Sequence, residues 1–424
     1  MHIQNDATAS TLTAGRRRMK GGMALGLLLG FCAATPWSWA EDPGITSNSI
    51  RIGATIPLEG DFRVYGLSMK RGMEAALADQ TVQKRRIEFI AINDFYNPAE
   101  AVNAAQQLIE KGIFAMVNSF GSPTTKAVLP LLAENKVPAI GFYTGAAFTG
   151  PGDVLNFRAG YAKEVETVVE TALAAGLKPT EVCAYAQNDA YGMAGIQGFR
   201  AALAKQPGTE SIVAKVDQIL NAPGDNPTRN GIGPVGTYQR DTLSARPGYL
   251  SLKKWETDTG DRCRLVATIA VYEPTVKFMG YARFKGEDWI FSSPSPAAGE
   301  RLADLLKDHK IRDKVIATQV VPAPNSPLPV VVDARKALGN DLNYVSLESY
   351  IVGKLFLAIL QAIDKPLTRE NFLKAARRQP YDIGGIQVDF TTSNQGSDFI
   401  LMTLLQDGHF TVIEPSDINK LFTQ

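Results

Sequence analysis

One segment of the chain combines a hydroxyl group with free helix-start amides directly after a predicted strand. Gly121-Ser-Pro-Thr-Thr125 follows a strand over 113–117 and begins a helix. We predict Ser122 as its N-cap and Pro123 as its first helical residue. The Ser122 hydroxyl and the amides of the next two threonines would suit a carboxylate. The alternative is plain helix capping, which any such helix needs.

The next strand, predicted over 137–142, ends in a second group of polar residues. Phe142-Tyr-Thr-Gly follows it, so Tyr143, Thr144 and Gly145 stand at the strand's carboxyl end. Ligands of doubly wound sheets bind at that edge. The sequence therefore predicts that two adjacent strands deliver hydroxyls and amides to one place.

The second half of the chain repeats this arrangement with tyrosines. A strand over 181–186 leads to Tyr191, and a strand over 264–271 leads to Tyr272 and Glu273. A tyrosine offers an apolar face and a hydroxyl, and Glu273 could meet a cationic group of a ligand. The alternative for Glu273 is a first-turn position beside the positive end of a helix dipole.

Motifs of common enzymes are absent or misplaced. Gly231–Gly236 matches a dinucleotide fingerprint in letters, but no apolar strand precedes it and Pro234 interrupts it. The sequence holds no Gly-x-Ser-x-Gly and no Cys-x-x-Cys. His309 and His409 stand in polar surroundings typical of surface residues. Nucleophilic or metal-assisted catalysis therefore has almost no candidate residues, and we expect neither a cofactor nor a metal.

Alternating strands and helices must position these groups. The first strand covers Ile50–Ile56, a helix follows near 66–79, and Tyr65 in the turn between them faces either the ligand or its own lobe. A second strand, Ile87–Ile92, leads to Asn97-Pro-Ala-Glu100, a capping box with Pro at the first helical position. The helix ends at Gly112. Such alternation predicts an α/β fold with parallel sheets covered by helices.

The same alternation of strands and helices begins again near residue 160 and predicts a second α/β unit. Its remaining predicted elements are helices over 163–175, 191–205 and 274–284, and strands over 211–217 and 288–292. After residue 294 the alternation resumes with a helix over 298–308 and a strand over 314–320. The interval 220–262 interrupts this unit, and we interpret it as a long loop with one short helix near 245–256. A Pro-rich segment then leads to helices over 345–363 and 368–378, and to short strands from Gly384 to Ile413.

Composition and the N-terminus indicate an exported protein. The chain has 424 residues, 45% of them hydrophobic, and a net charge of +1, which argues against a nucleic-acid partner. Arg16-Arg-Arg, an apolar run over 23–34 and Ser38-Trp-Ala40 predict a signal peptide over 1–40, cleaved after Ala40. A membrane anchor is the alternative, but the apolar run is short. Three cysteines and three histidines make a zinc fold improbable.

A series of short motifs follows one another along nearly the whole mature chain. They are Ile50-Arg-Ile-Gly-Ala-Thr-Ile-Pro-Leu-Glu-Gly60, Tyr65-Gly66, Arg71-Gly72, Asp94-Phe-Tyr-Asn-Pro98, Phe120-Gly-Ser-Pro123, Val137-Pro-Ala-Ile140, Asp189-Ala-Tyr-Gly192, Ser346-Leu-Glu-Ser-Tyr350, Gly384-Gly385 and Asn394-Gln-Gly-Ser397. In these motifs and their order the sequence resembles a known family, the periplasmic solute-binding proteins of the branched-chain amino-acid class. The order of the motifs makes the match specific.

The resemblance implies two doubly wound parallel-sheet lobes joined by a three-strand hinge, the type I periplasmic-binding fold, closing on a ligand between them. The expected lobe 1 comprises 45–158 and 294–396. The expected lobe 2 comprises 159–293 and 397–424, with 220–262 as an insertion that caps the cleft or contacts a partner.

The resemblance also implies roles for individual residues. Ser122, Thr144 and nearby amides would bind a carboxylate from lobe 1, and Tyr191 would close from lobe 2. Here the order is Tyr272-Glu-Pro where the amino-acid binders have Tyr-Pro-Glu, so Thr275 takes the acidic position if the register is kept. This departure, together with many aromatic residues, leaves open whether the ligand is an amino acid or an aromatic or other organic acid.

We therefore expect a periplasmic, monomeric receptor without enzymatic activity that captures a small carboxylate-bearing solute and delivers it to an ABC permease in the inner membrane. Two alternatives remain: a ligand sensor that presents its closed state to a receptor or enzyme, and an enzyme. Cys183 and Cys263 begin strands that the expected order of lobe 2 places side by side, which predicts a disulfide in an oxidising compartment.

Overall fold

The computed structural model describes most of the chain outside the N-terminus. The predicted signal peptide over 1–40 lies outside the described residues. The residues described are 42–150, 152–224, 226–297, 299–364 and 366–423.

The first lobe is built on a six-stranded sheet. Its strands run in parallel, except that the short edge strand β2 pairs antiparallel with β3. In spatial order the strands are β2 (Thr81–Val82), β3 (Arg85–Asn93), β1 (Ser49–Ile56), β4 (Ala115–Val117), β5 (Ala139–Ile140) and β6 (Val154–Leu155).

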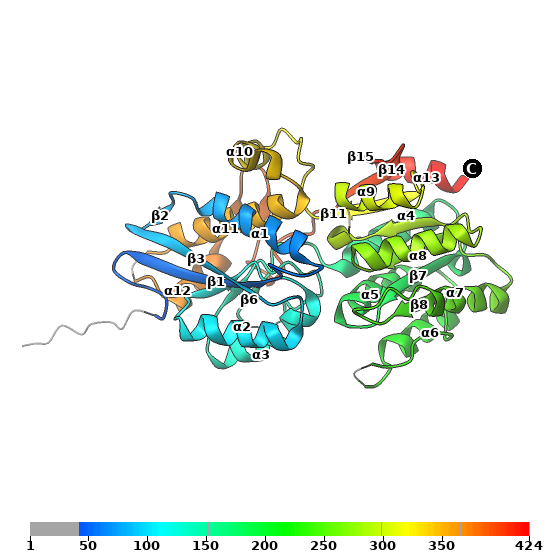
Figure 1. Ribbon diagram of the computed structural model, residues 1–424, viewed down its shortest axis with the longest axis horizontal. Coiled ribbons are helices and arrows are strands. Elements are labelled where there is room, and N and C mark those ends of the chain that lie inside the picture. Colours follow the sequence, from blue (N-terminus) through cyan, green and yellow to red (C-terminus); the bar gives the residue numbers. More distant parts are fainter. Residues whose placement is uncertain (1–41, 151, 225, 298, 365, 424) are drawn as a thin grey trace, which may run out of the picture. The chain divides into compact units, whose positions relative to one another are not determined.

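Helices cover both faces of this sheet. The helix α1 packs on α11, and α2 packs on α3, on opposite faces of the sheet (Figure 1). The helices of this lobe are α1 (Arg63–Leu77), α2 (Pro98–Glu110), α3 (Ser122–Glu134), α10 (Pro329–Leu338), α11 (Tyr344–Gln361) and α12 (Arg369–Arg378), with a 3₁₀ turn, η3 (Gly339–Asp341). A hairpin of β12 (Tyr381–Asp382) and β13 (Gln387–Val388) follows α12.

The second lobe is built on a seven-stranded sheet. Its central strands are parallel, and the C-terminal hairpin adds two antiparallel strands at one edge. In spatial order they are β15 (His409–Val412), β14 (Leu401–Gln406), β11 (Val315–Gln319), β10 (Ile290–Ser293), β9 (Leu265–Ile269), β7 (Val182–Gln187) and β8 (Val235–Tyr238).

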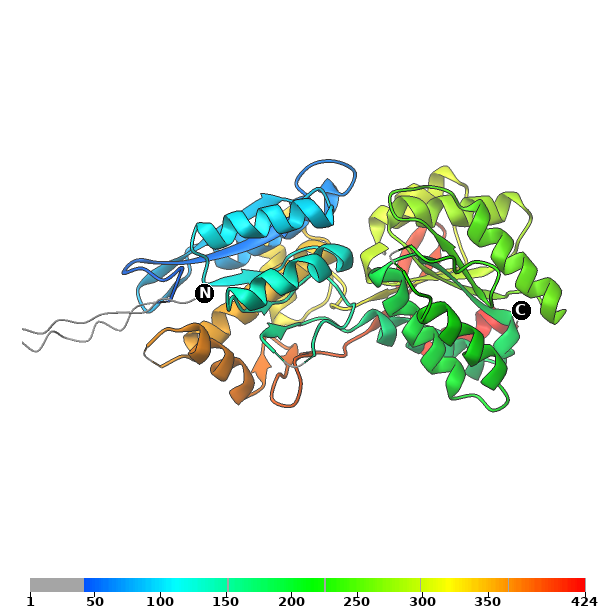
Figure 2. The same cartoon turned by 90° about the horizontal axis from the view of Figure 1, so that it is seen from below.

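Two groups of helices cover this second sheet on opposite faces, as Figure 2 shows. One group packs around α4 and the other around α8. The first comprises α4 (Tyr161–Ala174), α5 (Ala190–Ala204), α6 (Glu210–Leu220) and α13 (Pro415–Thr423), and the second α7 (Arg246–Thr259), α8 (Tyr272–Phe284) and α9 (Glu300–Asp308). Two 3₁₀ turns, η1 (Pro179–Glu181) and η2 (Ser295–Ala297), complete the lobe. The predicted α/β fold class with two doubly wound lobes is confirmed.

Three chain segments pass between the two sheets, and Figure 2 shows them. They are 156–160, between β6 and α4; 320–328, between β11 and α10; and 389–400, between β13 and β14. The first and third lie side by side, because the Asn156 amide donates to Asn394 O at 2.9 Å and the Gly396 amide donates to Asn156 O at 2.7 Å.

The expected return to the first lobe at residue 294 differs from the structure. The strand β11 pairs with β10 and β14 inside the second sheet, so η2, α9 and β11 belong to the second lobe and the chain crosses back only after Gln319. The sequence pattern after residue 294 predicts a helix and a strand but does not show which of the two sheets the strand joins, because strand pairing is decided by tertiary structure.

Two predicted elements are wrong. The segment predicted as a strand over 211–217 is the helix α6, which buries Ile212, Val216 and Ile219 at helical spacing. Its β-branched residues suggested a strand, but packing on α5 decides for helix. The interval 220–262 is also less irregular than expected: besides α7, it contributes β8, the edge strand that pairs with β7.

The predicted ends of α2 are confirmed. Asn97 Oδ1 accepts hydrogen bonds from the amides of Ala99 and Glu100, and Pro98 is the first residue of α2. The helix ends before Gly112, which has a φ of 67° that glycine adopts without strain.

The predicted disulfide is present. Cys183 in β7 and Cys263, just before β9, are bonded with their Cα atoms 5.8 Å apart. The two strands are neighbours in the second sheet, so the bond joins the starts of two adjacent strands near its β8 edge.

The long helix α11 forms the core of the first lobe. Among the described residues it is the one helix long and apolar enough to cross a membrane, and 72% of its apolar window is buried in the protein. That burial marks it as a core helix.

Candidate functional site

The carboxyl ends of strands from both sheets meet around a small cavity between the lobes. It has a volume of about 10 Å³. Its lining is mostly aromatic and comes from both lobes: Tyr96, Phe120, Gly121, Ser122, Tyr143, Tyr161, Tyr191, Val271 and Pro296. Four of the nine predicted site residues are brought together here, namely Gly121, Ser122, Tyr143 and Tyr191.

Two hydroxyl groups meet at the first-lobe side of this cavity. Ser122 Oγ and Thr144 Oγ1 are 2.7 Å apart and both side chains are buried. The Ala146 amide also donates to Thr144 Oγ1 at 3.2 Å. The predicted convergence of two strand ends on one spot is therefore present in the structure, although Thr144 stands behind the lining and does not form part of it.

The start of α3 differs by one residue from the prediction. Gly121, with a φ of 91°, is the N-cap, and Ser122 is the first helical residue. A Cβ at Gly121 would lie 2.4 Å from the Tyr96 ring, so only glycine fits against that ring. The Thr125 amide donates to Gly121 O at 3.1 Å, so it is not available to a ligand as expected.

Tyrosines form the second-lobe side. The Tyr191 hydroxyl donates to Ala270 O at 3.3 Å, and the Tyr161 ring meets the Tyr191 ring edge-on at 4.8 Å. Gly145 makes room for this pair, because a Cβ there would lie 2.7 Å from the Tyr161 amide nitrogen. Burial raises the pKa of Tyr143, Tyr161 and Tyr191, which keeps their hydroxyls protonated and able to donate.

Tyr65 and Tyr272 stack on each other across the two lobes. Their ring centroids are 5.0 Å apart with the planes 16° from parallel, and the Tyr65 hydroxyl donates to Pro296 O at 2.6 Å. Both line a larger pocket of about 730 Å³, and neither belongs to the lining of the small aromatic cavity.

Comparison with known proteins identifies this architecture. A family model described as "Periplasmic binding protein" matches residues 49–225. A solved structure of a possible leucine/isoleucine/valine-binding protein from Rhodopirellula baltica SH 1 is 27% identical, with a TM-score of 0.76, and the match covers 87% of this chain and 97% of that one.

The protein has the type I periplasmic-binding fold. The predicted resemblance is thereby confirmed.

Two further matches are more distant. The Leu/Ile/Val-binding protein homolog 2 of Brucella abortus (strain 2308) is 24% identical over 111 residues, which is 25% of this chain and 30% of that relative. The chain thus matches less than a third of the curated relative's length. A solute binding protein of an ABC transporter from R. palustris, solved in complex with 4-hydroxybenzoate, shares the fold at 18% identity, a TM-score of 0.69, and 87% and 96% coverage.

In this periplasmic-binding fold, Glu273 stands apart from the cavity. It lies in the first turn of α8, is half-buried, and belongs to the lining of neither interlobe cavity. Thr275 is buried and donates to Ala270 O at 3.1 Å, so it supports the backbone. Neither residue is placed to meet a ligand cation in the small cavity.

The two histidines among the described residues lie away from the cavity. His409 is exposed on the β14–β15 hairpin. His309 is half-buried at the end of α9, so it is less solvated than expected, because it packs against Gly280.

Segment 239–245, between β8 and α7, reaches from the second lobe to the first. Arg240 Nη1 donates to Tyr96 O at 3.1 Å, and its guanidinium lies 6.0 Å from the centre of the Tyr96 ring. Gln187 Nε2 lies 3.5 Å from the Tyr96 hydroxyl. The interval 220–262 therefore supplies a contact across the cleft, beside the cavity.

Tyr96 itself was missed by sequence reasoning, although its motif was noted. It has a φ of 57° and Phe95 a φ of 51°, and this turn is held by Asp94, whose Oδ1 accepts from the Tyr96 amide at 2.9 Å. Burial raises the pKa of Asp94 to about 7. Aspartate followed by a left-handed turn was the available signal.

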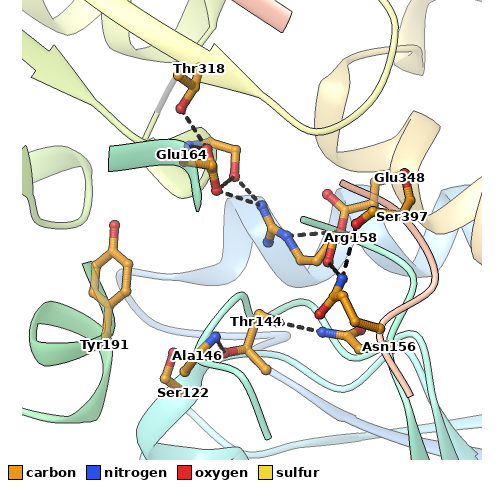
Figure 3. Close-up of polar contacts among 12 residues, drawn as sticks. Ser122, Thr144, Ala146, Asn156, Arg158, Glu164, Tyr191, Thr318, Glu348 and Ser397 are labelled. Carbon is orange, nitrogen blue, oxygen red and sulfur yellow. Dashed lines mark hydrogen bonds and ion pairs between the residues drawn. The ribbon is translucent and has the colours of Figure 1, made fainter. Parts of the chain in front are cut away.

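A buried arginine next to the cavity was also missed. Figure 3 shows the Arg158 guanidinium between Glu164 and Glu348, with Tyr191, Ser122 and Thr144 nearby. Asn156, two residues earlier, donates through Nδ2 to Thr144 O at 2.6 Å and so links the crossing segment to the hydroxyl pair. No pattern in the sequence distinguishes Arg158 from a surface arginine.

Proposed function

We propose that the protein is an extracytoplasmic solute-binding protein that captures a small carboxylate-bearing solute between its lobes and delivers it to an ABC permease. The observation that carries this proposal is the Ser122–Thr144 hydroxyl pair, which meets an aromatic cavity at the junction of the lobes. Hydroxyl donors at the start of α3 suit a carboxylate, because the helix dipole also favours negative charge there.

Access to this cavity requires movement of the lobes. A cavity of about 10 Å³ has room for about one water molecule at most, so an organic acid does not fit while the lobes are in this position. The stacked pair Tyr65 and Tyr272 and the Arg240–Tyr96 contact both join residues of different lobes. We infer that these contacts belong to a closed state, and that solute binding proceeds by opening and closure of the lobes.

The lining favours an aromatic or other organic acid over an amino acid. Among the described residues, the lining contains five aromatic rings and no acidic side chain that could pair with an ammonium group. Rings of this kind contact a planar apolar ligand over a large area. The R. palustris structure, which contains 4-hydroxybenzoate, is compatible with this ligand class.

A thermal-shift screen of residues 41–424 tests the proposal. We expect benzoate-type acids to raise the melting temperature, since a ligand of the native state stabilises it by mass action. Ser122→Ala should weaken binding about tenfold, the usual effect of losing one hydrogen bond to a charged group. Ser211→Ala, on the exposed face of α6, is the matched control.

Two comparisons make the screen decisive. 4-Hydroxybenzamide has the same shape as 4-hydroxybenzoate without the charge, so it should give no shift. An equal shift from the amide, or none from any acid, would contradict carboxylate capture. A larger shift from leucine than from every aromatic acid would contradict the preference for aromatic acids.

A further inference from the structure

Arg158 stands in the first crossing segment and is paired with a carboxylate from each lobe. Its Nη2 lies 3.9 Å from Glu164 Oε1 on α4, in the second lobe, and its Nε lies 3.4 Å from Glu348 Oε1 on α11, in the first lobe. The side chains of Arg158 and Glu164 are fully buried and that of Glu348 is 4% exposed. Arg158, Glu164 and Glu348 thus form a charged cluster that connects the two lobes and is shielded from water.

Further polar groups tie Glu164 to the second lobe. Its carboxylate accepts from the Ser295 amide at 2.8 Å, from Ser295 Oγ at 2.9 Å, and from Thr318 Oγ1 at 2.5 Å. Arg158 also donates to Ser295 Oγ, and its carbonyl accepts from Gln395 Nε2 of the third crossing segment. The first and third crossing segments thus meet at this cluster, and Thr318 of β11 precedes the second, as Figure 3 shows in part.

The guanidinium of Arg158 also contacts two aromatic rings that line the cavity. Its guanidinium lies 4.6 Å from the centre of the Tyr143 ring and 5.4 Å from that of Tyr161, and both tyrosines line the cavity. Within the described residues, Nε and Nη1 have no hydrogen-bond acceptor. Cation–π contacts and ion pairs, not a complete set of hydrogen bonds, therefore position the guanidinium.

The charges of the cluster do not balance when both carboxylates are ionised. The charged groups facing Glu348 are Arg158 and Glu164, and the titratable hydroxyls beside it belong to Tyr143 and Tyr161. Burying one net negative charge is costly unless a proton neutralises it. Burial raises the pKa of Glu348 to about 7, and it raises that of Glu164 as well.

We propose that Arg158 is a positioning residue of the solute cavity, held from both lobes by Glu164 and Glu348, and that closure of the lobes takes up one proton at Glu348. This inference rests on the lobe movement of the proposed function. When the lobes open, water reaches the cluster and Glu348 ionises as an ordinary carboxyl. The closed state then binds one more proton than the open state.

The sign of the pH effect follows from this difference. Between the ordinary carboxyl value, roughly 4.3, and the value of about 7 in the closed state, lowering the pH favours closure. The closed-to-open ratio should change by up to about tenfold per pH unit in this window, and should not change above it.

Distances between spin labels measure closure without any solute. Labels at Lys126→Cys on α3 and Glu210→Cys on α6 report on one lobe each, and both positions are exposed. We expect the population with the closed distance to grow when the pH falls from 8 to 5.5. In Glu348→Gln, which mimics the protonated acid, the closed distance should dominate at both pH values.

A matched control is Glu256→Gln. Glu256 is a buried carboxylate whose bonds, to the Cys263 amide and Lys253, remain inside the second lobe, so the pH response should persist. A wild-type distance independent of pH, or a Glu348→Gln variant that still responds, would overturn the inference. Neither result would affect carboxylate binding in the thermal-shift screen, so the two proposals fail independently.

Discussion

At the scale of single residues, the buried carboxyl of Asp94 determines the position of a residue that lines the cavity. Asp94 is fully buried; its Oδ1 holds the Tyr96 amide, and its Oδ2 has no partner among the described residues. The benefit is the position of Tyr96, which lines the cavity in a left-handed conformation. The cost is that a buried carboxyl is easier to keep protonated than ionised.

This cost predicts a pH dependence of stability. The pKa of Asp94 is about 7 in the folded protein and roughly 3.9 when unfolded, so the folded state binds the extra proton between these values. The free energy of unfolding should fall as the pH rises from 4 to 7, by up to about 1.4 kcal/mol per pH unit. Urea unfolding at pH 5 and pH 8 measures it. Asp94→Asn keeps the Oδ1 acceptor and should show a flatter dependence; an unchanged slope would refute this assignment.

At the scale of elements, a disulfide links two neighbouring strands of the second sheet. It joins the start of β7 to the segment before β9 and closes a loop of chain with a sequence separation of 80 residues. That loop contains α5, α6, β8 and α7, including the segment that contacts Tyr96. The bond therefore restricts the long stretch of chain that connects β7 to β9.

Replacing both cysteines by alanine should destabilise the protein. Native disulfides of this kind contribute about 2–5 kcal/mol, mainly by restricting the unfolded chain. Urea unfolding of the double variant, beside wild type with and without reductant, measures the loss. If the double variant unfolds within about 1 kcal/mol of the oxidised wild type, local packing and not the bond holds these strands.

At the scale of the whole molecule, residues from distant parts of the chain hold the lobes together. Arg240 meets Tyr96, Tyr65 stacks on Tyr272, and Arg158 joins Glu164 to Glu348. The first two contacts lie beside the cavity and the third lies at the crossing segments. Closure is therefore supported on both sides of the proposed solute.

Arg240→Ala should weaken closure without unfolding either lobe. Loss of a charge-assisted hydrogen bond of about 1.5 kcal/mol would lower the closed-to-open ratio roughly tenfold. It should also speed dissociation of whichever acid gives the largest thermal shift, since affinity changes act mostly on the off-rate. The spin-label pair and stopped-flow release measure the two effects. Arg246→Ala, exposed at the start of α7, is the control; equal effects from both would contradict a specific contact.

The sequence by itself determined the α/β class, most helix and strand positions, and the convergence of Ser122 with Thr144, because periodicity, capping residues and strand-end placement are local signals. Together with the strand order that the family resemblance implies, it also predicted the disulfide between Cys183 and Cys263. It misassigned 211–217, where packing overrides β-branched propensity, and placed the return between lobes before β11, because strand pairing is not written in local pattern.

Only the tertiary structure decided the rest of the candidate site. Glu273 and Tyr191 were both among the predicted ligand-binding residues, yet Glu273 stands outside the cavity and Tyr191 lines it. Arg158 reads as an ordinary charged residue, but the fold buries it between carboxylates from separate lobes. Burial and charge pairing depend on which distant segments meet, and that information arises only when the two sheets are assembled.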